Sequence, residues 1–84
     1  MNGELKNEIT SLLVEYGYLS PRDTDNLDTL DELGVDSLDI LDVLVDLEEK
    51  YEVDLSDIPL EDVNFMNIPR LTEIIEAHLW HIIL

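Results

Sequence analysis

Apolar residues recur with the period of an α-helix in three separate stretches of this chain, and this pattern restricts the fold more than any other feature. The stretches run from about residue 5 to 16, from 36 or 37 to about 51, and from Pro69 toward the C-terminus. No segment alternates apolar and polar residues for long enough to predict a strand. The pattern therefore predicts an all-α fold.

The two outer helices each have one apolar face. Gly17 follows the first as a plausible C-terminal cap, and Pro69 suits the first turn of the last. The first helix carries the apolar residues Leu5, Ile9, Leu12, Leu13 and Tyr16 on one face. The last helix carries a continuous stripe of Leu71, Ile74, Ile75, His78, Leu79 and Ile82. Both stripes suit packing against a shared core.

Residues 18–35 are expected to form a long loop, because they contain a Ser-Pro turn and many Asp, Thr and Asn residues that favour local side-chain bonds. Three of its apolar side chains could attach the loop to the core: Leu27, Leu30 and Leu33. A brief third helix is expected to begin with Pro59 in its first turn and to run through Phe65. The predicted architecture is a small helical bundle of three main helices plus one short helix, with a long first loop.

The composition fits one folded domain over residues 1–84 and excludes several classes of partner. A hydrophobic fraction of 45% supports a core despite a net charge of −17. Nucleic acid is excluded because the chain lacks basic patches, and an anionic membrane surface would repel it. No apolar stretch approaches the ~18 residues that span a bilayer. The only basic residues are Lys6, Arg22, Lys50 and Arg70.

The same composition indicates where the protein resides and what it meets. The N-terminal residues lack the basic start and apolar run of a signal peptide, so a cytoplasmic protein is expected. The chain has no cysteine, which excludes disulfides and thiolate sites. Basic protein surfaces are the natural complement of such a charge. A monomeric, free-standing protein is the resulting expectation.

The second helix has two neighbouring apolar faces, more than a core stripe requires. With residues placed 100° apart, one face carries Ile40, Val43, Leu44, Leu47 and Tyr51. The adjacent face carries Leu38, Leu41 and Val45 beside Ser37, with an acidic rim of Asp39, Asp42, Asp46 and Glu49. Either the 18–35 loop covers this second face, or the face is a docking strip for a partner.

Ser37 lies in the first turn of this helix, within the sequence Leu-Gly-Val-Asp-Ser-Leu-Asp that spans residues 33–39. Asp36 suits the N-cap position, and Asp39 follows three residues later as in a shortened capping box. The only histidines, His78 and His81, lie on the last helix, and no Gly-x-Ser-x-Gly elbow is present. A serine hydrolase is therefore rejected. The serine is either a plain capping residue or an exposed attachment point.

The Leu-Gly before Asp36, the Asp-Ser-Leu motif, the acid-rich helix after it and the chain length closely resemble the acyl carrier proteins, and the resemblance covers most of the chain. It implies that Ser37 carries a 4′-phosphopantetheine arm, whose thiol holds an acyl group as a thioester. It also implies that a phosphopantetheinyl transferase takes the arm from coenzyme A. Asp36 would then help to hold Mg²⁺, present only during transfer, or basic side chains of the transferase. The carrier itself would have no catalytic residue.

In acyl carrier proteins, partner enzymes contact the positions that match Leu38, Asp39, Asp42 and Val45. The expected partner surface here comprises Leu38, Asp39, Leu41, Asp42, Val45, Glu49, Glu61 and Asp62. The partners would be enzymes with basic surfaces that load or consume acyl or aminoacyl groups in fatty-acid, polyketide or specialised biosynthesis.

Three departures from the family pattern favour a dedicated carrier over the general fatty-acid carrier. Asp46 stands where a small apolar residue is common, Lys50 replaces an acid, and residues 18–30 differ from the usual loop. A D-alanyl or other aminoacyl carrier is an alternative, and so is an acidic helical interaction module whose serine is unmodified.

No dedicated metal site is predicted. The acidic segment at residues 23–28 fails the calcium-loop pattern, because Leu27 and Asp28 stand where a ligand and a glycine belong. His78 and His81 lack an evident third ligand, so His78 is interpreted as a partly buried packing residue. A short second stripe on the last helix, with no role that the sequence decides, consists of Trp80, Ile83 and Leu84.

Overall fold

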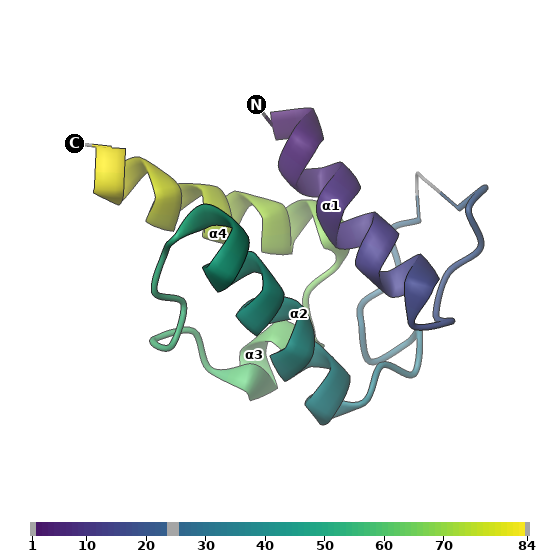
Figure 1. The fold of residues 1–84 in the computed structure, drawn as a ribbon. Helices are drawn as coiled ribbons and strands as arrows, with labels where there is room; N and C mark the ends of the chain where they lie inside the picture. Colours follow the sequence, from purple (N-terminus) through teal and green to yellow (C-terminus); the bar gives the residue numbers. More distant parts are fainter. Residues whose placement is uncertain (1, 24–25, 84) are drawn as a thin grey trace.

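A computed structural model describes residues 2–23 and 26–83 of the chain, and the side chains of residues 3–23 and 26–79. Over these residues the chain forms four helices and no strand: α1 (Asn2–Glu15), α2 (Ser37–Tyr51), α3 (Leu60–Asn64) and α4 (Ile68–Ile83). Figure 1 shows the long loop between α1 and α2 and the short α3 in the return from α2 to α4. The predicted all-α bundle of three main helices plus one short helix is confirmed.

Helix α1 ends in the left-handed turn that its glycine predicts. Gly17 has φ +91°. The Tyr18 N–H donates to the Leu13 carbonyl at 2.9 Å, and the Gly17 N–H donates to the Val14 carbonyl at 3.0 Å. This is the bond pair of a Schellman motif, which satisfies the last carbonyls of the helix. The motif sends the chain back toward the core at Tyr18.

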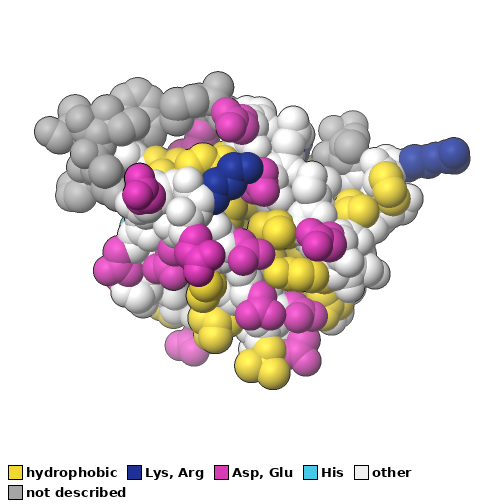
Figure 2. Space-filling model, in the orientation of Figure 1, with side chains coloured by type: hydrophobic (Ala, Val, Ile, Leu, Met, Phe, Trp, Pro, Cys, Tyr) yellow, Lys and Arg dark blue, Asp and Glu magenta, His cyan; other side chains and the backbone are white. Residues whose placement is uncertain are grey.

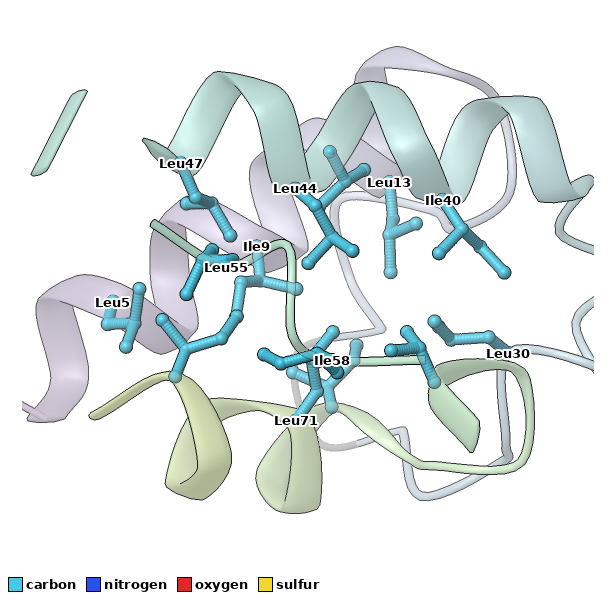
Figure 3. Close-up of a cluster of buried hydrophobic side chains, with 14 of the residues drawn as sticks. Leu5, Ile9, Leu13, Leu30, Ile40, Leu44, Leu47, Leu55, Ile58 and Leu71 are labelled. Atoms are coloured by element: carbon cyan, nitrogen blue, oxygen red, sulfur yellow. The ribbon is translucent and has the colours of Figure 1, made fainter. Parts of the chain in front are cut away.

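The core is a single apolar cluster at the centre of the bundle (Figure 3). The predicted core faces supply much of it, since Leu5, Ile9 and Leu13 of α1 are at most 2% exposed. Loop residues contribute as well, and the sequence pattern did not identify most of them. The buried side chains outside the helices are Leu19, Leu30, Val35, Val53, Leu55 and Ile58.

Helices α1 and α2 run in opposite directions, as their polar contacts show. Lys50 near the end of α2 pairs with Glu8 in α1, with 2.6 Å between Nζ and Oε2. The Tyr16 hydroxyl, just after α1, donates to Asp46 in the middle of α2 at 3.3 Å. Helix α4 packs against α1, and α3 packs against α2.

Backbone hydrogen bonds attach the first loop to the last residue of α3 and to the segment that follows it. The Leu30 N–H donates to the Met66 carbonyl at 3.0 Å, and the Asp31 N–H donates to the Asn64 carbonyl at 2.8 Å. Gly34, with φ +78°, then turns the chain into α2. These contacts fix the point where α2 begins.

Several sequence predictions need correction. Leu27 does not attach the loop to the core, because its side chain is 68% exposed; Leu30 is buried and Leu33 is half-buried. Pro59 is the N-cap of α3 and not a residue of its first turn, and Phe65 lies just beyond the helix with 69% exposure. The side chains of His81 and Ile82, and the stripe of Trp80, Ile83 and Leu84, lie outside the described side chains.

Among the described helices, none has the length and apolar character needed to pass through a bilayer.

Candidate functional site

Asp36 is the N-cap of α2. It has extended backbone angles (φ −70°, ψ 146°), and its Oδ1 accepts the Leu38 N–H at 2.8 Å. Its carbonyl accepts the first intrahelical bond, from the Ile40 N–H at 2.9 Å. Asp36 therefore has the capping role that the sequence predicts.

Ser37 is the first residue of α2 and is exposed. Within the described part of the chain, no hydrogen bond engages its hydroxyl, because the neighbouring Asp36 performs the capping. A serine in this position is accessible to another protein and has no role in folding. The interpretation of Ser37 as a plain capping residue is therefore wrong.

The start of α2 also suits the phosphodiester that a 4′-phosphopantetheine arm would bring. The first N–H groups of a helix lack intrahelical partners, and the helix dipole places positive partial charge there. The carboxylates of Asp36 and Asp39 repel an anion at this position. A phosphate group brought here is therefore favoured when cations are supplied from outside the chain. The free N–H groups at the start of α2 suit the phosphate of the attached arm. The two carboxylates suit Mg²⁺ or basic side chains that assist during its transfer.

Tyr18 reaches this turn from the first loop, and the sequence analysis did not identify it. Its hydroxyl donates to the carboxylate of Asp39 and accepts the Asp36 N–H at 3.4 Å. The expected direct capping bond from Asp39 back to Asp36 is thus replaced by a contact through Tyr18. The hydrogen bond to Asp39 raises the pKa of Tyr18 above its usual 10.0.

The second apolar face of α2 is open. Leu38 is 70% exposed, Leu41 42% and Val45 38%, whereas Val43, Leu44 and Leu47 on the first face are buried. The first loop therefore does not cover this second face, and that alternative is wrong. Of the predicted rim, Asp42 and Glu49 are exposed and Asp39 is half-buried. We call Leu38, Leu41, Val45, Asp39, Asp42 and Glu49 the docking strip; Ser37 stands at one end of it.

A groove of about 220 Å³ connects this face to α3. Leu41 of the docking strip and Leu60 of α3 both line it, and Glu48 is its one charged lining residue. The predicted partner residues Glu61 and Asp62 follow Leu60 and are exposed. The full lining is Leu41, Leu44, Glu48, Leu55, Ser56, Ile58 and Leu60.

Negative charge dominates this side of the molecule. Figure 2 shows carboxylates interleaved with apolar side chains across the region of α2, and few basic groups. The one basic residue of α2, Lys50, is held by Glu8, and this hydrogen bond raises the Lys50 pKa. A surface with an apolar centre and an acidic rim suits a partner that presents apolar and basic side chains.

His78 is half-buried, as expected, but it also makes a polar contact between α4 and the loop before α3. Its Nδ1 lies 2.9 Å from the Ile74 carbonyl, and its Nε2 lies 2.9 Å from Oδ1 of Asp57. The hydrogen bond to Ile74, followed by the contact with Asp57, raises the His78 pKa above 6.5. Among the described residues there is no cluster of three or more His, Cys, Asp or Glu side chains suited to a metal ion.

Comparison with known proteins gives one match. A family model described as a phosphopantetheine attachment site covers residues 7–77, from α1 into α4, and this range includes Ser37. No curated protein and no solved structure matches the chain.

Proposed function

Because the chain belongs to the phosphopantetheine attachment site family, whose members are carriers and not enzymes, we propose that it is an acyl carrier protein whose arm is attached at Ser37. The family carries 4′-phosphopantetheine as a covalent group. When attached, this group supplies a flexible arm ending in a thiol that holds cargo as a thioester. The observation that supports Ser37 as the attachment residue is its exposed side chain at the start of α2, next to a cap that leaves its hydroxyl free.

The proposed transfer requires help from outside the chain. No histidine lies near Ser37 in sequence, and the neighbouring acids repel an incoming phosphate. The transferase is therefore proposed to supply the cations that offset this repulsion. Asp36 is proposed to help hold Mg²⁺ or basic transferase side chains, because its exposed carboxylate adjoins Ser37.

The docking strip, together with Glu61 and Asp62 on α3, is proposed as the surface that partner enzymes contact. Its support is the exposure of three apolar residues on a helix whose opposite face already fills the core. The groove between Leu41 and Leu60 is lined mainly by apolar side chains, which suits an acyl cargo. We place the carrier in the cytoplasm, serving fatty-acid, polyketide or a specialised biosynthesis.

The test is the intact mass of the purified protein after incubation with coenzyme A, Mg²⁺ and a phosphopantetheinyl transferase. We expect a gain of one phosphopantetheine in the wild type and none in Ser37→Ala. Ser11→Ala is the matched control, because Ser11 is an exposed serine in the middle of α1, and this variant should be loaded like the wild type. Loading of Ser37→Ala, or no loading of the wild type by several transferases of broad specificity, would overturn the proposal.

A further inference from the structure

Tyr18 contacts Asp36, which precedes Ser37, and Asp39, which lies two residues after it. Its hydroxyl accepts the backbone N–H of Asp36 at 3.4 Å and donates to the side chain of Asp39. The two contacts cross 18 and 21 positions of sequence, from the end of α1 to the start of α2. A single hydroxyl group therefore links the first loop to the turn that presents Ser37.

This link fixes a part of the site that would otherwise be free to rotate. In an ordinary capping box the N3 carboxylate accepts the N-cap N–H directly. Here the Asp39 carboxylate is held by Tyr18 instead, and Asp39 is half-buried while Ser37 and Leu38 are exposed. The Schellman turn at Gly17 ties the Tyr18 backbone to the end of α1 through two hydrogen bonds, and the ring reaches the start of α2 from there.

We propose that Tyr18 is a positioning residue for the loading of Ser37, holding the Asp36 backbone and the Asp39 carboxylate in the arrangement that the transferase receives. This inference rests on the proposed function. A reacting hydroxyl must be presented in a narrow range of geometries, and small displacements of its support reduce the rate. Tyr18 does not contact the reacting atoms itself and acts through Asp36 and Asp39.

The chain contains a matched control. Tyr16 precedes Tyr18 by two residues, and its hydroxyl also donates to a carboxylate of α2, Asp46, at 3.3 Å. Asp46 lies seven residues beyond Asp39 and nine beyond Ser37, roughly two and a half helical turns away from the serine. Tyr16→Phe therefore removes the same kind of hydrogen bond, from a tyrosine after α1 to a carboxylate of α2, without affecting the first turn of α2.

The experiment compares the wild type, Tyr18→Phe, Tyr16→Phe, Asp39→Ala and the Tyr18→Phe/Asp39→Ala double variant. Steady-state loading by a phosphopantetheinyl transferase with coenzyme A gives kcat and KM, at a temperature where circular dichroism shows each variant folded. We expect Tyr18→Phe to lower kcat about 3- to 10-fold, the range that one hydrogen bond supports, with less than about a 2-fold change in KM. Tyr16→Phe should match the wild type. Tyr18→Phe should lower kcat by a smaller factor in the Asp39→Ala background than in the wild type.

A second measurement does not depend on the transferase. The Asp36 amide should exchange with solvent faster, and its NMR resonance should shift, in Tyr18→Phe but not in Tyr16→Phe. If Tyr18→Phe does not fold, Asp39→Ala removes the contact to the carboxylate and leaves the contact to Asp36, and it should still lower kcat. Loss of Asp39 as a docking-strip residue would instead raise KM alone, and that result would overturn the positioning role.

Other outcomes separate this inference from the proposed function. Equal kcat values for Tyr18→Phe and Tyr16→Phe would overturn the positioning role, and so would a rise in KM alone, which would place Tyr18 in the docking surface instead. Failure to load the wild type at all would overturn the proposed attachment at Ser37 and, with it, the premise of this inference.

Discussion

The carboxylate of Asp36 has two separable roles, one in folding and one in the proposed transfer. Its Oδ1 caps α2 through the Leu38 N–H, and its negative charge is available beside Ser37. Asparagine retains an oxygen that can cap but carries no charge, and alanine retains neither. We therefore expect Asp36→Ala to lower the free energy of unfolding by about 0.5–2 kcal/mol, while Asp36→Asn changes it little. Both variants should be loaded more slowly. Urea denaturation measures the change in stability, and loading assays measure the change in rate. Loading of Asp36→Asn at the wild-type rate would show that the charge has no role.

His78 makes the stability of the fold depend on pH. Both ring nitrogens face acceptors, the Ile74 carbonyl and Asp57, which favours the protonated ring. Its folded-state pKa is raised above 6.5, so its contribution is fully present below about pH 6.5 and is lost as pH rises through the folded-state pKa. The difference in unfolding free energy between the wild type and His78→Gln should therefore be larger at pH 6 than at pH 8. Taking the difference between the two proteins at each pH cancels the effect that carboxylate protonation has on the stability of both. A pH-independent difference would show that the contact with Asp57 is not charge-dependent.

Helix α2 separates the face that fills the core from the exposed face that we propose partners contact. Leu47 is fully buried, and truncation to alanine would leave a core cavity, whereas Val45 is 38% exposed. We expect Leu47→Ala to cost about 2–5 kcal/mol of unfolding free energy and Val45→Ala to cost less than about 1 kcal/mol. Loading should show the reverse order below the unfolding transition, with Val45→Ala raising KM. Similar stability losses in both variants would assign the second face of α2 to the core.

The helices of this fold were predictable because each has a regular apolar face and a local signal at its ends. Gly17 and Asp36 are examples, since a glycine after an apolar stripe and an aspartate before one mark helix boundaries through backbone chemistry alone. The second apolar face of α2 followed from the same periodicity, whereas Ser37 was singled out by the Asp-Ser-Leu motif and the family resemblance, and its role as the attachment residue stays a prediction. These features depend on residues within a few turns of one another.

The loops were less predictable, because their residues follow no period. Leu27 and Leu30 looked equivalent in sequence, yet only Leu30 is buried, since its backbone pairs with Met66 near the end of α3. The contact between Tyr18 and Asp39 spans 21 residues and depends on how α1 and α2 pack. A tyrosine immediately after the capping glycine was the one local signal for it.

At the scale of the whole molecule, the large net charge predicts that self-repulsion limits stability. The net charge is −17, and the exposed acids of α2 and the first loop lie on a small surface with little compensation from Lys50. We expect the melting temperature to rise with salt, and to rise more with Mg²⁺ or Ca²⁺ than with NaCl at equal ionic strength. Circular dichroism melts with and without each salt make the measurement. A flat response would show that the charges are far enough apart to be independent. The same repulsion predicts a monomer at low salt, which light scattering would detect.

The location of Ser37 at one end of the docking strip has a kinetic consequence. With the arm attached at Ser37 as proposed, its free end would sample a confined volume once a partner holds the strip, and its encounter with the partner's active site would become intramolecular. Delivery then depends on an effective concentration set by the reach of the arm and no longer on the bulk concentration of carrier. Contact with the strip can therefore be weak and short-lived without slowing delivery, and rapid release allows one carrier to visit successive enzymes.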